Sequence, residues 1–375
     1  MMKKAARSTY ILITAVFTAF AICACNGTAK EEEAAPKTPT PTPEAVSEPA
    51  EPVQPEATVT SEDDYTEGLG DTFSGQTEEP DENSDNRDVD LIFFMGQSNM
   101  SGAAGDASLA PHVPESAGME FRAVSDPSTL YPITEPFGIN ENDPSGLHEF
   151  PGAKKGSLVS AFVNEYHELT GRRVIAVSIS MGATDMKAWM SPGAVADVKT
   201  RYDRSLKYLK DNGYNVGHIY ALWLHGESDA IEGTDPGVYR TDLDDIMRPL
   251  FIGGLQKVFI ITPGRTIDYK DIFLNIIDMQ KQICAESGYY AIGTTVLTGV
   301  STEYMRDQYH YNQHVLNLVG IETARSVAYY MQNGVEKIVY DYRKGEYIIP
   351  AEVDPDSQEK EEPIDLSSIN IDEVY

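Results

Sequence analysis

Between residues 89 and 350 the chain alternates between two hydrophobic patterns. Short, partly β-branched apolar runs are typical of buried strands, and longer segments with helical spacing separate them. The runs lie at 90–95, 173–180, 218–224, 257–262 and 289–295, and the helical segments at about 157–170, 198–212, 236–250, 271–287 and 313–332. This alternation predicts an α/β domain, with an open parallel sheet of about five strands and helices on both faces. Such sheets bind ligands at the carboxyl ends of their strands.

The remainder of this region is less regular. Residues 103–155 are rich in Pro, Gly and Ser, so we expect a long loop over the ligand-binding edge of the sheet. We expect residues 336–350 to form a small hairpin. Residues 351–375 form an acidic tail, which we expect to be loosely attached.

The net charge of −30 lies largely outside the predicted domain. Residues 26–88 carry −15 and residues 351–375 carry −8, whereas residues 89–350 carry −10. Binding to nucleic acid needs a surface rich in Lys and Arg, so we expect no nucleic-acid partner. The three cysteines are too few for a disulfide framework or a cysteine-based zinc site.

The first 25 residues have the pattern of an export signal. A basic start precedes an apolar run from Tyr10 to Cys23, which is shorter than the roughly 20 residues that a membrane-spanning helix needs. The run ends in Ile22-Cys23-Ala24-Cys25, which resembles a bacterial lipobox and implies lipidation of Cys25. A diacylated cysteine would hold the protein at the extracytoplasmic face of a bacterial membrane through its lipid alone. An ordinary cleaved signal and an uncleaved anchor are the alternatives.

Residues 26–88 are rich in Pro, Glu, Thr and Ser. Such a stretch buries too little apolar surface to offset the conformational entropy lost on ordering, so we expect a disordered tether. The predicted organisation is a signal peptide (1–25), this tether, one domain (89–350) and the acidic tail (351–375).

A serine motif directly follows the first predicted strand. Gly96-Gln97-Ser98-Asn99-Met100 places Ser98 at a strand-to-helix turn, where its hydroxyl is exposed at the edge of the sheet. A serine in that position is suited to be a nucleophile whose own N–H faces the substrate oxygen. Alternatively, Ser98 only caps the helix that follows.

Three further segments are predicted to reach the same edge. Gly182 follows the second strand and brings a backbone N–H that no side chain shields. A block containing His225 and Glu227 follows the third strand. Asp307 and His310, three residues apart, precede the last helix, so Asp307 can hold the imidazole while it takes the proton from Ser98.

These blocks together resemble the sialate O-acetylesterase-type carbohydrate esterases of the SGNH/GDSL hydrolase superfamily. The resemblance covers about residues 89–332 and rests on GQSNM, on Trp223 with Gly226-Glu227 and Asp229, and on Asp307-x-x-His310. It implies a flavodoxin-like three-layer α/β/α fold and metal-independent deacetylation of sugars without a cofactor. It also implies specific roles for four residues: Ser98 as nucleophile, His310 as base, Asp307 as its orienting acid, and the N–H groups of Ser98 and Gly182 as the oxyanion hole.

The chain departs from the family pattern at one position. The family usually has Gln before Gly-Glu, in the slot thought to bind near the oxyanion, and this chain has His225. A histidine donates there only in the correct tautomer or when protonated, so His225 is either a third oxyanion donor or a tolerated variant. Glu227 is either a supporting acid for His310 or a brace for its loop.

The expected activity is that of a tethered serine esterase acting on O-acetylated carbohydrate, either acetylated xylan or another polysaccharide, or O-acetyl sialic acid. Trp189 is a candidate platform for a sugar ring, with core packing as the alternative. Two rival functions remain: a non-catalytic glycan-binding lipoprotein on the same fold, and a lipid esterase or thioesterase of the same superfamily.

Overall fold

The computed structural model describes residues 87–269 and 271–366. The predicted signal peptide, Cys25 and nearly all of the predicted tether lie outside the described residues. Among those described, no helix is both long and apolar enough to cross a membrane.

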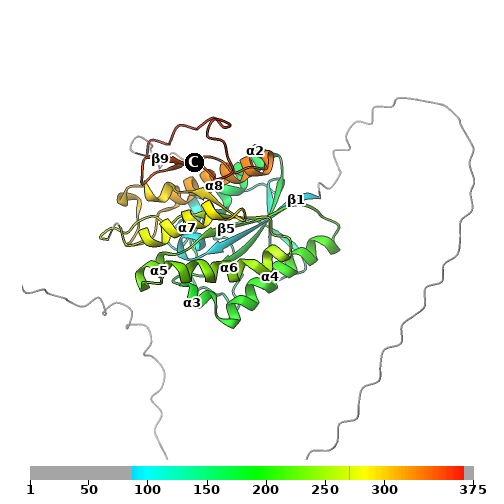
Figure 1. Ribbon diagram of the computed structural model, residues 1–375. Coiled ribbons are helices and arrows are strands. Elements are labelled where there is room, and N and C mark those ends of the chain that lie inside the picture. Colours follow the sequence, from blue (N-terminus) through cyan, green and yellow to red (C-terminus); the bar gives the residue numbers. More distant parts are fainter. Residues whose placement is uncertain (1–86, 270, 367–375) are drawn as a thin grey trace, which may run out of the picture. The chain divides into compact units, whose positions relative to one another are not determined.

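A seven-stranded sheet forms the centre of the domain, in the order β3-β2-β4-β1-β5-β6-β7 (Figure 1). The strands are β1 (Asp88–Gly96), β2 (Gly118–Phe121), β3 (Leu130–Pro132), β4 (Arg173–Ser180), β5 (Asn215–Leu224), β6 (Lys257–Ile261) and β7 (Tyr290–Thr294). All neighbouring pairs are parallel except the edge pair β2 and β3. The five predicted strands and the parallel α/β class are confirmed. The expected strand number was too low, because β2 and β3 lie within the segment predicted as loop.

The central strand β1 is apolar on both faces. Leu91, Phe93 and Met95 belong to one buried cluster, whereas Ile92 and Phe94 belong to the other. Side chains alternate between the faces of a strand, so an uninterrupted apolar run is required where helices cover both sides.

Two layers of helices cover the sheet, on opposite faces (Figure 1). Residues of α2 (Val159–Thr170) and α8 (Gln313–Asn333) contribute to one buried cluster. Residues of α4 (Pro192–Asp211), α6 (Pro236–Ile252) and α7 (Leu274–Glu286) contribute to the other. The α4 and α6 helices each begin with a side-chain cap followed by proline, which fits the first helical position. The domain is therefore a three-layer α/β/α sandwich, as the sequence resemblance implies.

The segment after α8 includes the predicted hairpin, formed by β8 (Val339–Asp341) and β9 (Glu346–Ile348). Residues 351–366 are attached more firmly than their acidic composition predicts. Ile364 and Leu366 pack against the buried cluster that contains α8, and the side chain of Gln358 bonds to the backbone at Glu336 and Ile338. The expectation of a loose tail is therefore wrong for residues 351–366.

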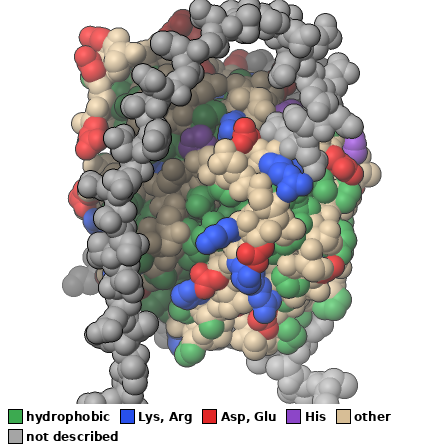
Figure 2. All heavy atoms as spheres, turned by 90° about the vertical axis from the view of Figure 1, so that its right-hand side faces the viewer, with side chains coloured by type: hydrophobic (Ala, Val, Ile, Leu, Met, Phe, Trp, Pro, Cys, Tyr) green, Lys and Arg blue, Asp and Glu red, His purple; other side chains and the backbone are tan. Residues whose placement is uncertain are grey.

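Figure 2 shows the side of the domain where β1 begins. Lys and Arg side chains lie there beside Asp and Glu side chains, so the visible charges are of both signs.

Candidate active site

Strand register brings three sequence blocks to one edge of the sheet. Gly96 at the end of β1 pairs with Ser180 of β4 on one side and with Leu224 of β5 on the other. Ser98 and Gly182 each follow two residues later, so both lie at the carboxyl edge, where open α/β sheets bind ligands.

Gly96 makes the sharp turn before Ser98 possible. Its φ is +147°, and a Cβ at this position would lie 2.0 Å from the carbonyl oxygen of Leu224. The N–H of Gln97 then donates to that same oxygen at 3.0 Å. Ser98 is thus the first residue of the short helix α1 (Ser98–Ser101), where the helix itself supplies no acceptor for its N–H.

Ser98, His310 and Asp307 form a hydrogen-bonded chain. Nε2 of His310 lies 2.7 Å from Oγ of Ser98, and Nδ1 lies 2.9 and 2.8 Å from Oδ1 and Oδ2 of Asp307. Burial would raise the pKa of Asp307, but hydrogen bonds from the Tyr309 N–H and from His310 outweigh it and lower that pKa below its ordinary value. An ionised Asp307 holds the imidazole with Nε2 toward the serine hydroxyl, the arrangement that general-base catalysis requires.

Asn99 links the serine turn to the segment carrying His310. Its Nδ2 donates to Oε1 of Glu227 at 2.9 Å and to the carbonyl of Tyr309 at 3.2 Å, and its Oδ1 accepts from the N–H of Tyr311 at 3.4 Å. The residue after the serine therefore fixes the backbone on both sides of His310.

Glu227 braces this network through Asn99 and, within the described part of the chain, makes no hydrogen bond to His310. Its Oε2 has no partner there, and burial raises its pKa. Of the two acids considered from the sequence, Asp307 is the one that contacts the histidine.

Gly182 lies against Ser98, as its predicted role requires. A Cβ built on Gly182 would lie 3.4 Å from Cβ of Ser98. The next residue, Ala183, has a φ of +55°, a strained value for a residue with a side chain. The Gly182 N–H donates to Oε1 of Glu149 at 2.5 Å, and that oxygen also accepts from Oγ of Ser101 at 2.6 Å. Neither Glu149 nor Ser101 was a candidate from the sequence, because Glu149 lies in an irregular loop with no motif around it.

His225 does not present an N–H to this site, which corrects the prediction of a third oxyanion donor. Its ring is fully buried between Trp189, Trp223 and Tyr239. Neither ring nitrogen makes a hydrogen bond among the described residues, although Nδ1 lies 3.6 Å from Oδ2 of Asp229, and burial lowers the pKa of His225 to about 3. The side chain points into the helix-covered face of the sheet and fills a packing role.

Trp189 is also buried, so the prediction of a sugar platform is wrong. The residue is 0% exposed, and its Nε1 donates to Oγ1 of Thr184 at 3.0 Å. Its ring meets Trp223 edge to face at 4.8 Å between centroids. No face of the indole is left for a ligand.

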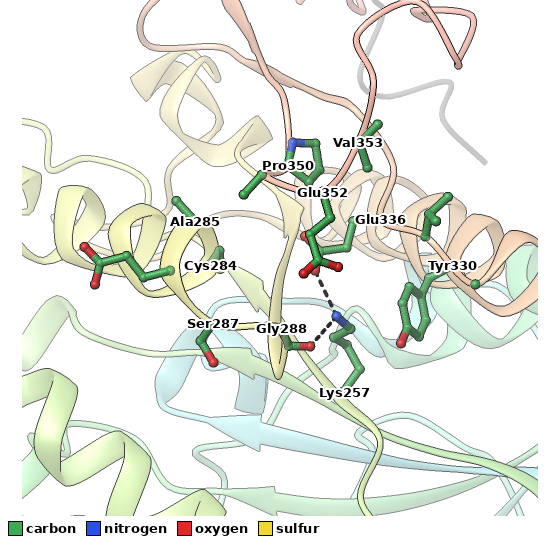
Figure 3. A pocket seen from close by; sticks show the side chains of 14 residues that line it. Lys257, Cys284, Ala285, Ser287, Gly288, Tyr330, Glu336, Pro350, Glu352 and Val353 are labelled. Carbon is green, nitrogen blue, oxygen red and sulfur yellow. Dashed lines mark hydrogen bonds and ion pairs between the residues drawn. The ribbon is translucent and has the colours of Figure 1, made fainter.

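A cavity of about 300 Å³ lies elsewhere, at the edge of the sheet where Lys257 begins β6 (Figure 3). Lys257 Nζ donates there to the carbonyl of Gly288 at 2.6 Å and to Oε1 of Glu336 at 2.8 Å. Ser98 and His310 do not line this cavity. Across 87–269 and 271–366, no group of His, Cys, Asp and Glu side chains is arranged to hold a metal ion.

The sheet, its two helical layers and a serine–histidine pair at the carboxyl edge define an SGNH-type hydrolase. Residues 88–328 match the family described as carbohydrate esterase, sialic acid-specific acetylesterase, and the chain belongs to this family. It is therefore a member of a group of hydrolytic esterases that act on acetylated carbohydrate.

Solved structures with similar folds share little sequence with this chain. A protein from Arabidopsis thaliana is 18% identical with a TM-score of 0.48, covering 65% of this chain and 98% of that one. A carbohydrate acetylesterase from Xanthomonas citri is 16% identical (TM-score 0.40, 64% and 57% coverage). A Geobacillus acetyl-xylooligosaccharide esterase is 11% identical (TM-score 0.33, 66% and 95% coverage). A search of curated proteins finds no significant match.

Proposed function

We propose that this protein is a serine esterase that removes O-acetyl groups from carbohydrate through an acetyl-enzyme intermediate. The observation that carries the proposal is the 2.7 Å contact between Oγ of Ser98 and Nε2 of His310, with Asp307 on the other ring nitrogen. A serine hydroxyl is a weak nucleophile until an adjacent base accepts its proton, and this chain supplies that base.

The proposed reaction has two stages. Ser98 Oγ attacks the acetyl carbonyl carbon while His310 Nε2 takes the hydroxyl proton, and the resulting oxyanion is bound by the N–H groups of Ser98 and Gly182. The sugar oxygen then leaves with the proton held by His310, and the acetyl group remains on Ser98. Water, deprotonated by the same histidine, attacks the acetyl-enzyme, the bond between Ser98 Oγ and the acetyl carbon breaks, and His310 returns the proton to Ser98 Oγ as acetate leaves.

Two exposed aromatic rings near the site are candidates for contact with sugar rings, in place of the buried Trp189. Phe150, 77% exposed, directly follows Glu149. Tyr269, 57% exposed, follows Asp268, whose Oδ2 accepts from the side chain of Gln308 at 2.9 Å. Exposed ring faces on two loops whose neighbouring residues contact the site suit a chain of neutral sugars, so we favour an acetylated polysaccharide over sialic acid as the substrate.

Acetate release tests this proposal. Wild type is expected to release acetate from acetylated xylan, and Ser98→Ala to lose that activity. Ser108→Ala, which removes an exposed serine hydroxyl elsewhere on the same edge loop, serves as the matched control. Equal acetate release by wild type and Ser98→Ala would refute the nucleophile assignment. O-acetyl sialic acid, assayed in parallel, decides between the two sugar classes.

A fluorophosphonate probe separates the rival functions. Labelling of wild type but not of Ser98→Ala indicates an activated serine, whereas no labelling and no turnover would favour a glycan-binding role. Faster hydrolysis of long-chain acyl esters than of acetyl esters would instead indicate a lipid esterase or thioesterase.

We further propose that the enzyme is exported and anchored by lipid on Cys25. The support is the sequence pattern that ends at this cysteine and the acidic, proline-rich stretch that follows it. Metabolic labelling with a fatty-acid analogue is expected to mark wild type but not Cys25→Ala, and equal labelling of both would exclude this anchor.

A further inference from the structure

The carboxylate of Glu149 accepts a hydrogen bond from the Gly182 N–H, which the proposed mechanism assigns to binding of the oxyanion. Oε1 of Glu149 accepts both the Gly182 N–H, at 2.5 Å, and the Ser101 hydroxyl, at 2.6 Å. Two donors from two different strand ends thus converge on a single carboxylate oxygen.

This carboxylate and the nucleophile lie on the same side of Gly182. A Cβ built on Gly182 would lie 3.3 Å from both carboxylate oxygens of Glu149 and 3.4 Å from Cβ of Ser98. Glu149 therefore occupies space directly beside the serine that an acetyl group would enter.

Occupation by Glu149 is incompatible with the proposed transition state. The Gly182 N–H is a single donor, and while it binds Glu149 it cannot bind an oxyanion. A carboxylate beside an oxyanion also places two negative charges a few ångströms apart in a partly buried site, where their repulsion is poorly screened.

We propose that Glu149 is a built-in occupant of the oxyanion subsite, which substrate must displace, and that the vacated subsite binds small carboxylates such as acetate. The proposal rests on the proposed function in assigning Gly182 to the oxyanion. The chemistry of the ligand is read from the occupant itself: two hydrogen-bond donors already hold one carboxylate, and acetate offers the same group.

The loop permits this displacement. The Glu149 backbone N–H donates to Oδ1 of Asn142 at 2.8 Å, which holds the main chain while the side chain keeps its rotatable bonds. Glu149 is only partly buried, and the next residue, Phe150, is largely exposed. The carboxylate can therefore rotate into solvent without unfolding its segment.

Two variants test the proposal, with a matched control in the same loop. Glu149→Ala removes the occupant, and Glu149→Gln removes its charge but keeps an oxygen that can accept. Asp143→Asn removes an equal charge from a side chain whose hydrogen bonds, among the described residues, are to Ser145 in its own turn. We expect kcat/KM for a small aryl acetate to rise roughly tenfold in the alanine variant and less in the glutamine variant. Asp143→Asn is expected to match wild type.

Acetate binding, followed by NMR line broadening of labelled acetate, provides a readout that needs no turnover. Glu149→Ala is expected to bind acetate roughly tenfold more tightly than wild type or Asp143→Asn, because the competing carboxylate is gone. Equal acetate affinity in all three proteins would overturn the proposal, as would an unchanged or lower kcat/KM in an active enzyme. If wild type proves inactive and unlabelled by fluorophosphonate, the proposed function fails, and acetate binding alone still decides whether Glu149 occupies a carboxylate subsite.

Discussion

Ser98 and His310 are 212 residues apart in the sequence, yet Oγ of the serine lies 2.7 Å from Nε2 of the histidine. Their contact depends on the topology of the sheet, because Ser98 follows the central strand β1 and His310 precedes α8, whose buried residues share one cluster with Ile92 and Phe94 of that strand. Asn99 connects the serine turn to the histidine segment by hydrogen-bonding to the backbone on either side of His310. The residue next to the nucleophile thus sets the position of the base.

The two acids near His310 are expected to differ sharply in their effect on turnover. Asp307 touches the ring with both oxygens, whereas Glu227 reaches it only through Asn99. Asp307→Asn should lower kcat/KM by roughly 1000-fold or more, since it removes the charge that orients and stabilises the imidazolium. Glu227→Gln keeps an acceptor for Asn99, so we expect a loss of no more than about tenfold. Steady-state kinetics on an acetyl ester measure both, and the reverse order would contradict the assignment.

Gly96 is expected to tolerate no side chain. In Gly96→Ala the new Cβ would clash with the backbone carbonyl of Leu224, and the φ of +147° is unfavourable for a residue with a side chain. Because the carbonyl and the φ angle both belong to the backbone, a change of side-chain rotamer cannot relieve the strain. We expect the free energy of unfolding to fall by about 3 kcal/mol or more. Gly171→Ala is the control, because Gly171 has a φ of +67° with open space around it and should cost only about 1 kcal/mol. Urea unfolding compares the two, and similar losses would argue against a steric role for Gly96.

Much of the fold was predictable because the first four predicted strands carry buried apolar runs. The strands β2 and β3 escaped prediction since each is three or four residues long and lies among turn-forming residues, too short to show a period. The tail was judged by its charge, although two of its apolar residues, Ile364 and Leu366, pack on the domain.

The candidate site was predictable where a motif fixed the residue at a strand end. Ser98 and Gly182 follow strand ends in this way, and the Asp307-x-x-His310 motif before α8 meets them at the same edge. The orientations of the His225 and Trp189 side chains could not be predicted, because a motif does not indicate on which face of the sheet a side chain is buried. Glu149 comes from a long irregular loop, and only three-dimensional packing places it beside Gly182.

Phe150 is expected to contribute to binding of a sugar polymer and not to the chemistry. Its ring is exposed, and it directly follows Glu149, whose carboxylate touches Gly182, so we expect it to contact sugar next to the acetylated unit. Phe150→Ala should raise KM for acetylated xylan several-fold, with kcat/KM for a small aryl acetate unchanged. Ile252→Ala, which removes an exposed side chain at the end of α6, is the control. Equal effects of Phe150→Ala on both substrates would exclude a sugar-specific contact.

His225 is expected to make the fold sensitive to acid. Burial lowers its pKa from the ordinary value of 6.5 to about 3, so between these pH values the unfolded chain binds a proton that the folded chain does not. Stability from this residue is therefore complete above pH 6.5 and falls as the pH decreases, by about 1.4 kcal/mol per pH unit. Asp229 acts in the opposite direction, because burial raises its pKa to about 6 and its folded form takes up a proton first. The wild-type profile alone thus mixes two opposing effects.

Comparison with His225→Gln measures the histidine together with its effect on Asp229, which is present in both proteins and whose Oδ2 lies 3.6 Å from Nδ1 of His225. Relative to wild type, His225→Gln should gain about 2 kcal/mol in free energy of unfolding when the pH is lowered from 7.5 to 5. Urea unfolding at pH 7.5 and pH 5 gives the change in free energy of unfolding for each protein, and the two changes are then compared. His112→Gln, which replaces an exposed histidine, is the matched control for the substitution itself. A gap between wild type and His225→Gln that stays constant from pH 7.5 to 5 would mean that His225 accepts a proton in the folded protein, with the neighbouring Asp229 carboxylate as its partner.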